Sequence, residues 1–240
     1  MKKNKLLISS VIALVIIIGG YFAFDYYAGN HIEINDVFEE TEENETMVQD
    51  EQPAAQSNTD FTSEELDLNG EWEITEDSNV YLSIKTSKEE VNIQFSDVSG
   101  QWNINQNEPN LVEAEATVGI TSIDSGNSQR DSHVQGLRFL DAEQFSEATF
   151  ELQSIEQFPD LWLSGETNSI LLKGDLTIKG ITNQVTFEAE VLPENDELKL
   201  KAETIVTFND FGMENPHTVV LDTENDVKIT LQLVLNNTTI

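Results

Sequence analysis

The sequence predicts an all-β fold, a closed antiparallel barrel of about eight strands preceded by one N-terminal transmembrane helix. Three observations carry this prediction. From residue 69 onward, apolar residues recur with a period of two, which is the repeat of a strand with one buried face. Turn sequences separate these runs, and each run has one apolar and one charged face. Before them, residues 6–24 form an apolar run without a single charge.

The N-terminal apolar run has the length of a membrane span. As a helix it reaches roughly 28 Å, close to the hydrocarbon thickness of a bilayer. Lys2, Lys3 and Lys5 precede it and an acidic chain follows, which predicts a cytoplasmic N-terminus and an extracellular C-terminal domain. We therefore expect a single-pass cell-membrane protein with residues 1–24 as anchor or uncleaved signal. A cleaved secretory signal is the alternative, although its apolar region is usually shorter.

Residues 25–68 are predicted to be an acidic, disordered spacer. They contain no Lys or Arg, many Asp and Glu, and few aliphatic residues. Such a composition buries too little apolar area to offset the entropy of ordering, and its charges repel one another. As a flexible coil of about 44 residues, the spacer would span roughly 35–40 Å. We expect it to hold the domain at residues 69–240 clear of the membrane.

The domain at residues 69–240 alternates apolar and polar residues in run after run, most clearly at 112–120, 148–152, 170–178, 185–191, 198–202 and 227–235. The sequences at 179–183 and 193–196 predict turns between consecutive strands. Residues 131–145 break the period of two and predict a short helical insertion. Strands with one apolar and one charged face suit a barrel with an apolar interior and an acidic exterior.

The interior of such a barrel has two interpretations. An eight-stranded barrel is either filled by its own side chains or holds one small ligand. Small residues on the inward rows would leave a cavity, unless large residues opposite them fill the space. These small residues are Ala114, Ala116, Ala148, Gly174, Ala189 and Ala202.

Composition excludes several classes of protein. With 12 Lys and Arg against 45 Asp and Glu, the net charge is −33, which argues against a nucleic-acid partner. The chain has no cysteine, which excludes disulfide scaffolds and thiol chemistry. It also lacks nucleophile-elbow, zinc-protease, phosphate-loop and dinucleotide motifs. Paired carboxylates suited to glycoside hydrolysis arise by chance among so many acids. We expect no enzymatic activity, no cofactor and no metal.

Several stretches resemble the YceI-like family. Residues 130–141, RDSHVQGLRFLD, together with Phe145 and Phe150, resemble its R-D-x-H…F-F-D…F…F signature. Residues 174–187, GDLTIKGITNQVTF, are similar to its G-x-L-T-I-x-G-V-T-x-x-V-T-L hairpin. Shorter matches are GQW at 100–102 and DFGM at 210–213. The resemblance extends over residues 70–238.

The resemblance implies an extended lipocalin-like barrel that binds a polyisoprenoid or similar long amphipathic lipid and is not an enzyme. The alternative is a solid-cored structural or stress-related module of the cell envelope, and a homodimer is left open. The expected apolar lining comprises Val118, Ile120, Phe139, Leu140, Phe145, Phe150, Leu152, Leu176, Ile178 and Phe187.

Three residues are assigned to the rim of the barrel. Arg130, Asp131 and His133 would order the insertion and contact a polar head group. In the competing interpretation, Arg130 and Asp131 hold a turn through hydrogen bonds, and His133 packs beside it. The apolar residues of the signature would likewise line a pocket or plug the barrel end; these are Phe139, Leu140, Phe145 and Phe150.

Overall fold

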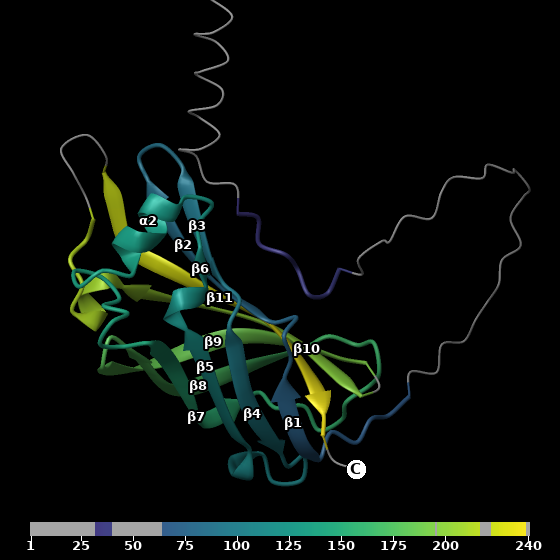
Figure 1. Ribbon diagram of the computed structural model, residues 1–240. Coiled ribbons are helices and arrows are strands. Elements are labelled where there is room, and N and C mark those ends of the chain that lie inside the picture. The colour runs from purple at the N-terminus through teal and green to yellow at the C-terminus, as the bar shows by residue number, and fades with distance from the viewer. Residues whose placement is uncertain (1–31, 40–63, 195, 217–221, 239–240) are drawn as a thin grey trace, which may run out of the picture.

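The computed structural model describes residues 32–39, 64–194, 196–216 and 222–238 (Figure 1). Within them the chain is all-β, with one α-helix, α2 (Ser128–Val134), and short 3-10 turns η1 (Pro109–Leu111), η2 (Ile120–Ser122) and η3 (Phe208–Phe211). The strands are β1 (Gly70–Ile74), β2 (Asn79–Thr86), β3 (Glu90–Phe95), β4 (Val98–Ile104), β5 (Glu113–Gly119), β6 (Ile123–Asp124), β7 (Glu147–Glu156), β8 (Asn168–Ile178), β9 (Ile181–Glu194), β10 (Glu197–Thr207) and β11 (Thr223–Asn237).

The sheet closes into an antiparallel barrel, which confirms the barrel that the sequence predicts for residues 69–240. Its order is β1-β4-β5-β7-β8-β9-β10-β11, and β11 pairs again with β1. This ring contains eight strands among the described residues. The predicted hairpin at 179–183 is the β8–β9 turn. There Lys179 and Gly180 both have positive φ angles, the backbone that two-residue hairpins require.

Three of the long strands bend. β2, β3 and β6 continue β1, β4 and β5, and they extend the barrel wall beside β11. The bend between β1 and β2 has a hydrogen-bonded support. The buried Ser78 hydroxyl contacts both the backbone N–H and the carbonyl of Val234, at 2.9 and 3.2 Å. The side chain thus replaces a main-chain partner where the ladder is interrupted.

One end of the barrel is closed by packed side chains, which leave a cavity of only about 20 Å³. The β7–β8 connection crosses under it beside residues 64–68, where the Leu66 N–H donates to the Trp162 carbonyl at 2.9 Å. The Trp72 indole donates to the Leu68 carbonyl, also at 2.9 Å. Phe158 and Trp162 stack edge to face, with ring centroids 5.4 Å apart. We call this the closed end, and Leu68, Trp72 and Trp162 are all buried there.

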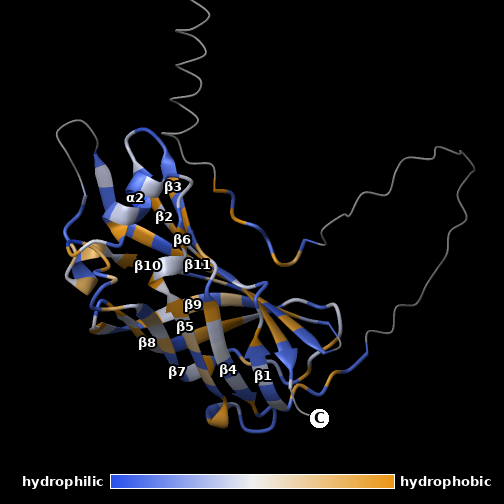
Figure 2. Cartoon of the chain, viewed as in Figure 1, coloured by the Kyte–Doolittle hydropathy of each residue, from blue (hydrophilic) through white to orange (hydrophobic). Residues whose placement is uncertain are grey.

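The opposite end, which we call the mouth, carries the connections at 86–90, 125–146 and 178–181 and the described residues 207–216 and 222–223. The predicted insertion lies here. Its helix is α2, which begins where the Asn127 side chain accepts hydrogen bonds from the backbone N–H groups of Gln129 and Arg130, both at 3.1 Å. This N-cap fixes the first turn of a helix of only seven residues. Figure 2 shows apolar residues alternating with hydrophilic ones along the strands.

The anchor predicted at residues 1–24 lies outside the described residues, as does most of the predicted spacer at 25–68. In the described part of the chain, no helix combines the length and apolar character that a bilayer span needs. Two pieces of the predicted spacer are described, and both contact the barrel. Residues 64–68 form part of the closed end, and residues 32–39, here called the strap, lie on the outer wall.

Candidate functional site

The barrel interior contains an apolar chamber of about 80 Å³, which we call the inner chamber. It lies between the closed end and the mouth, and its wall comes from nearly every strand. Small side chains at Ala116 and Ala148 leave much of the space. The remaining lining is Val80, Leu82, Phe95, Val98, Trp102, Val118, Ile120, Leu140, Thr149, Phe150, Leu172, Leu176, Ile178, Phe187, Ile229, Leu231 and Leu233.

A second, larger chamber of about 380 Å³ lies toward the mouth, and we call it the outer chamber. It shares Leu82, Leu140, Ile178 and Ile229 with the inner chamber, so the two chambers adjoin at these side chains. Its wall adds polar residues at the solvent side, including Lys88, Glu89, Arg130 and His133. Deeper apolar lining comes from Ile84, Val91, Ile93, Val134, Phe139, Val206, Phe208, Phe211, Met213 and Val227.

The structure gathers most of the predicted lining around these chambers. Phe139 contributes to the outer chamber and lies under the ring of His133, with centroids 5.0 Å apart. Leu140 and Ile178 contribute to both chambers. The predicted residues at the inner chamber are Val118, Ile120, Leu140, Phe150, Leu176, Ile178 and Phe187.

Two residues of the predicted lining lie outside both chambers. Phe145 packs over the β8–β9 turn, where a Cβ atom added to Gly180 would lie 2.6 Å from its ring. Leu152 pairs with Gly174 at the start of a register shift in β7, and it is half-buried toward the closed end. The position of Phe145 is set by its packing on the β8–β9 turn, and that of Leu152 by the register shift in β7. The alternation of residue types does not predict either.

The floor of the inner chamber depends on a close approach between β7 and β8. The Phe150 ring lies over Gly174, and a Cβ atom at this glycine would collide with the ring and with the Glu151 carbonyl oxygen. Phe150 also meets Phe187 edge to face, with centroids 5.4 Å apart. The glycine therefore provides the space in which the aromatic pair fits.

The three predicted rim residues occupy different positions. Arg130 and His133 line the outer chamber, on the first and second turns of α2. The Asp131 carboxylate instead accepts a hydrogen bond from the Ser125 N–H at 2.9 Å, which ties the helix to the end of β6. The rim thus combines a turn-holding carboxylate with two basic side chains that face the chamber.

Sequence reasoning omitted the lining from β2, β3, β10 and β11. Leu82, Ile84, Ile229 and Val206 are examples, and the β2 and β11 residues follow the same period of two that identified the other strands. Phe208 and Phe211 lie in η3, which carries no such period. Their signal is the residues 210–213 that resemble the family's late motif.

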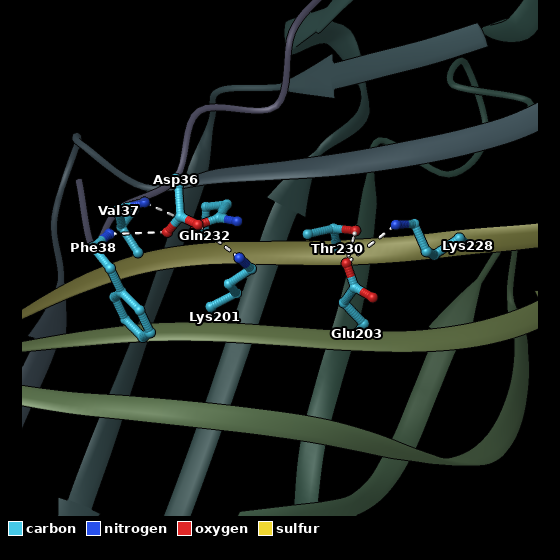
Figure 3. A network of polar contacts seen from close by, with 8 residues as sticks. All are labelled: Asp36, Val37, Phe38, Lys201, Glu203, Lys228, Thr230 and Gln232. Carbon is cyan, nitrogen blue, oxygen red and sulfur yellow. Dashed lines mark hydrogen bonds and ion pairs between the residues drawn. The ribbon is translucent and has the colours of Figure 1, made fainter. Parts of the chain in front are cut away.

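The strap follows the outer wall across β3, β2, β11 and β10. The side chain of Asn92 donates to the Ile32 carbonyl at 3.0 Å, and the Val37 N–H donates to the Gln232 side chain at 3.0 Å. Lys201 forms a 2.6 Å ion pair with Asp36, as Figure 3 shows. The strap alternates half-buried and exposed residues over 32–36, as expected for a chain with one face against a surface.

Burial and charge shift the pKa values of groups along this contact. Burial alone raises the pKa of Asp36, but hydrogen bonds from Lys201 and the Phe38 N–H, with the lysine charge, lower it overall. The Asp36 hydrogen bond raises the pKa of Lys201. On β2, the fully buried Tyr81 has a raised hydroxyl pKa because of desolvation, which a contact with the Asn35 backbone partly offsets.

The interior has the chemistry of a binding site for apolar matter. The inner chamber is almost entirely apolar, and charged groups appear only where the outer chamber meets solvent. The described residues contain no cluster of three or more side chains suited to hold a metal ion. Such a site can bury the apolar surface of an elongated molecule, and it provides polar contacts for the end of that molecule nearest to solvent.

The fold and the cavity define a class of protein, a closed antiparallel barrel with an apolar interior that reaches one end. Within that class the family is specific. Residues 72–235 match the YceI-like domain, and the chain belongs to this family.

Comparison with individual proteins agrees with this membership. A UPF0312 protein from Shewanella oneidensis is 26% identical over 127 residues, which are 50% of this chain and 63% of that protein. The chain thus matches less than two thirds of that relative's length.

Two solved structures share the fold. BcnA from Burkholderia cenocepacia has a TM-score of 0.58 at 22% identity, covering 67% of this chain and 98% of that one. A polyisoprenoid binding domain from Saccharophagus degradans has a TM-score of 0.57 at 12% identity, covering 69% and 98%.

Proposed function

We propose that this protein holds a polyisoprenoid or similar long-chain lipid inside its barrel and does so on the outer side of the cell membrane. The observation that carries the proposal is the pair of adjoining, mainly apolar chambers, of about 80 and 380 Å³. The outer one alone has the size of an ordinary ligand pocket, roughly 300–1,000 Å³. A solved structure with this fold, from Saccharophagus degradans, is named for polyisoprenoid binding.

Apolar burial is sufficient to give such a complex useful affinity. Removing about 300 Å² of lipid surface from water contributes roughly 8 kcal/mol at 25 cal/mol per Å², before the costs of ordering the chain. The lipid tail would occupy the inner chamber. Its polar head would lie beside Arg130, His133 and Lys88, the basic residues at the solvent side of the outer chamber. These residues orient the lipid, and apolar contact holds it.

The proposed location follows from the N-terminal sequence. The uncharged run at residues 6–24 would anchor the chain, and the lysines before it would stay in the cytoplasm. The barrel would then lie outside the cell, where a lipid that leaves the bilayer needs an apolar container. The binding role requires no catalytic group.

Lipid extraction tests the proposal directly. The full chain is purified in detergent and extracted with organic solvent, and bound lipid is quantified by mass spectrometry. Phe150→Trp narrows the inner chamber, whereas Phe158→Trp makes the same change at the closed end, away from both chambers. We expect stoichiometric lipid from the natural chain and from Phe158→Trp, with a clear loss in Phe150→Trp.

The comparison of Phe150→Trp with Phe158→Trp distinguishes lipid bound inside the barrel from lipid that copurifies with the N-terminal apolar run. Equal lipid in all three proteins would mean that none of it occupies the barrel. Absence of stoichiometric lipid from the natural chain would favour the alternative, a solid-cored structural module of the cell envelope.

A further inference from the structure

The strap enters the barrel wall close to the mouth. Its first described residue, Ile32, contacts Asn92, which lies two residues beyond the β2–β3 hairpin tip at 86–90. Asn92 is also held by Ser83, whose hydroxyl donates to its side chain at 2.8 Å. The chain that precedes residue 32 therefore leaves from the mouth half of the barrel.

The other end of the strap lies deeper along the wall. Asp36 and Val37 contact Lys201 and Gln232, which are register partners of one another (Figure 3). On β11 this level is four residues farther from the mouth than Lys228, the register partner of Ser83. The strap thus runs diagonally, from the mouth toward the middle, and its direction is set by contacts at both ends.

Only a short segment of sequence separates the strap from the predicted membrane anchor. Seven residues, 25–31, separate the uncharged run at 6–24 from the strap. Fully extended, seven residues reach at most about 25 Å. A spacer of about 44 flexible residues would leave the barrel free to turn, but a strap fixed at residue 32 shortens the tether to this distance.

Charge favours the same end of the barrel. Five of the nine Lys and Arg residues between 64 and 238 belong to the mouth segments, namely Lys85, Lys88, Arg130, Arg138 and Lys179. These segments, at 85–90, 124–147, 178–181, 207–216 and 222–224, carry eleven acids with the five bases, whereas the closed-end segments at 64–69, 104–113, 156–168 and 194–197 carry eleven acids and no Lys or Arg. The mouth is therefore the end that an anionic lipid surface repels least.

We propose that the strap holds the barrel with its mouth facing the lipid surface in which residues 6–24 reside. The inference rests on the tether and lipid binding proposed above, and it adds the orientation and the partner, a bilayer surface within about 25 Å of the mouth. In this arrangement a lipid that passes between the bilayer and the outer chamber crosses at most about 25 Å of solvent.

Site-specific labels on the full chain in vesicles test the orientation. The chain has no cysteine, so Leu137→Cys and Leu161→Cys each introduce a single label site. These exposed residues lie at the mouth and at the closed end, respectively. The vesicles are phosphatidylcholine with a fraction of phosphatidylglycerol and a nitroxide-headgroup lipid that quenches fluorescence at short range. Flotation confirms that the protein is attached.

We expect the mouth label to be quenched at least about threefold more than the closed-end label, since strands such as β10 are about 36 Å long. Releasing the strap with Asp36→Ala and Asn92→Ala together should bring the two values close together, whereas Glu39→Ala, an exposed strap residue, should not. Equal quenching in the natural chain, or stronger quenching at the closed end, overturns the orientation alone. Failure of the full chain to float overturns the tether as well.

Discussion

Filling the inner chamber from the barrel wall should weaken lipid binding without unfolding the protein. Ala148 lies on β7 with its small side chain at this chamber. Replacement by Leu adds three carbon atoms. These carbon atoms enter a chamber of about 80 Å³. The new side chain and the last few carbons of a lipid tail therefore compete for the same volume.

The size of the effect follows from the apolar groups that the lipid can no longer bury. Each buried methylene contributes about 0.8 kcal/mol, so three of them contribute about 2.4 kcal/mol. This difference corresponds to a dissociation constant raised about 50-fold. The same three groups become buried protein atoms in Ala148→Leu. We therefore expect the free energy of unfolding to stay within about 1.5 kcal/mol of the natural chain, because the gain in burial offsets repacking strain.

Two assays on the full chain in detergent check this expectation. Titration with farnesol, an isoprenoid alcohol, by isothermal calorimetry gives the dissociation constant, and urea unfolding gives the stability. Thr186→Leu adds a comparable apolar group on the exposed face of β9 and should change neither. An unchanged dissociation constant for Ala148→Leu would refute the assignment of the tail to the inner chamber. A loss of stability well above 3 kcal/mol would show that the chamber has no room to fill.

Three further predictions concern stability. The Asp36–Lys201 pair should contribute about 1 kcal/mol to a double-mutant cycle at pH 7. That coupling should disappear as the pH falls through the lowered pKa of Asp36 or rises through the raised pKa of Lys201; a pH-independent value in urea titrations would contradict it. Gly174→Ala should cost about 1–3 kcal/mol in thermal unfolding, because its Cβ meets a backbone carbonyl, and an unchanged melting temperature would count against this close approach. Asn127→Ala should cost about 1 kcal/mol and speed amide exchange in α2, whereas unaltered exchange would mean that the cap is dispensable.

The barrel could be predicted from sequence because alternation reports directly on burial. In β8, for example, Ile170, Leu172, Leu176 and Ile178 are buried, as their spacing predicts. The same logic places Phe150 and Phe187 on the inner face, but it gives no volume for the space between them. That volume depends on the fit of one ring over Gly174, a tertiary contact that no local pattern specifies.

The strap shows a different limit of composition-based reasoning. Averaged over residues 25–68, the sequence is acidic and poor in aliphatic residues, which predicts disorder. Within it, Ile32, Ile34, Val37 and Phe38 form a local apolar group that the average conceals. The strap is bound to the barrel by partners more than 45 residues away, including Lys201 and Asn92.

Because one end of the barrel is closed, its cavity opens at the mouth and does not run through the barrel. Under the proposed function, a lipid tail would enter from the mouth, reach the inner chamber that Trp102 helps to line, and leave by the same route. The polar head group of such a lipid would be the last part to enter the barrel and the first part to leave it. If the proposed lipid binding holds, a lipid donor and a lipid acceptor would both have to contact the mouth, and they could do so only one after the other.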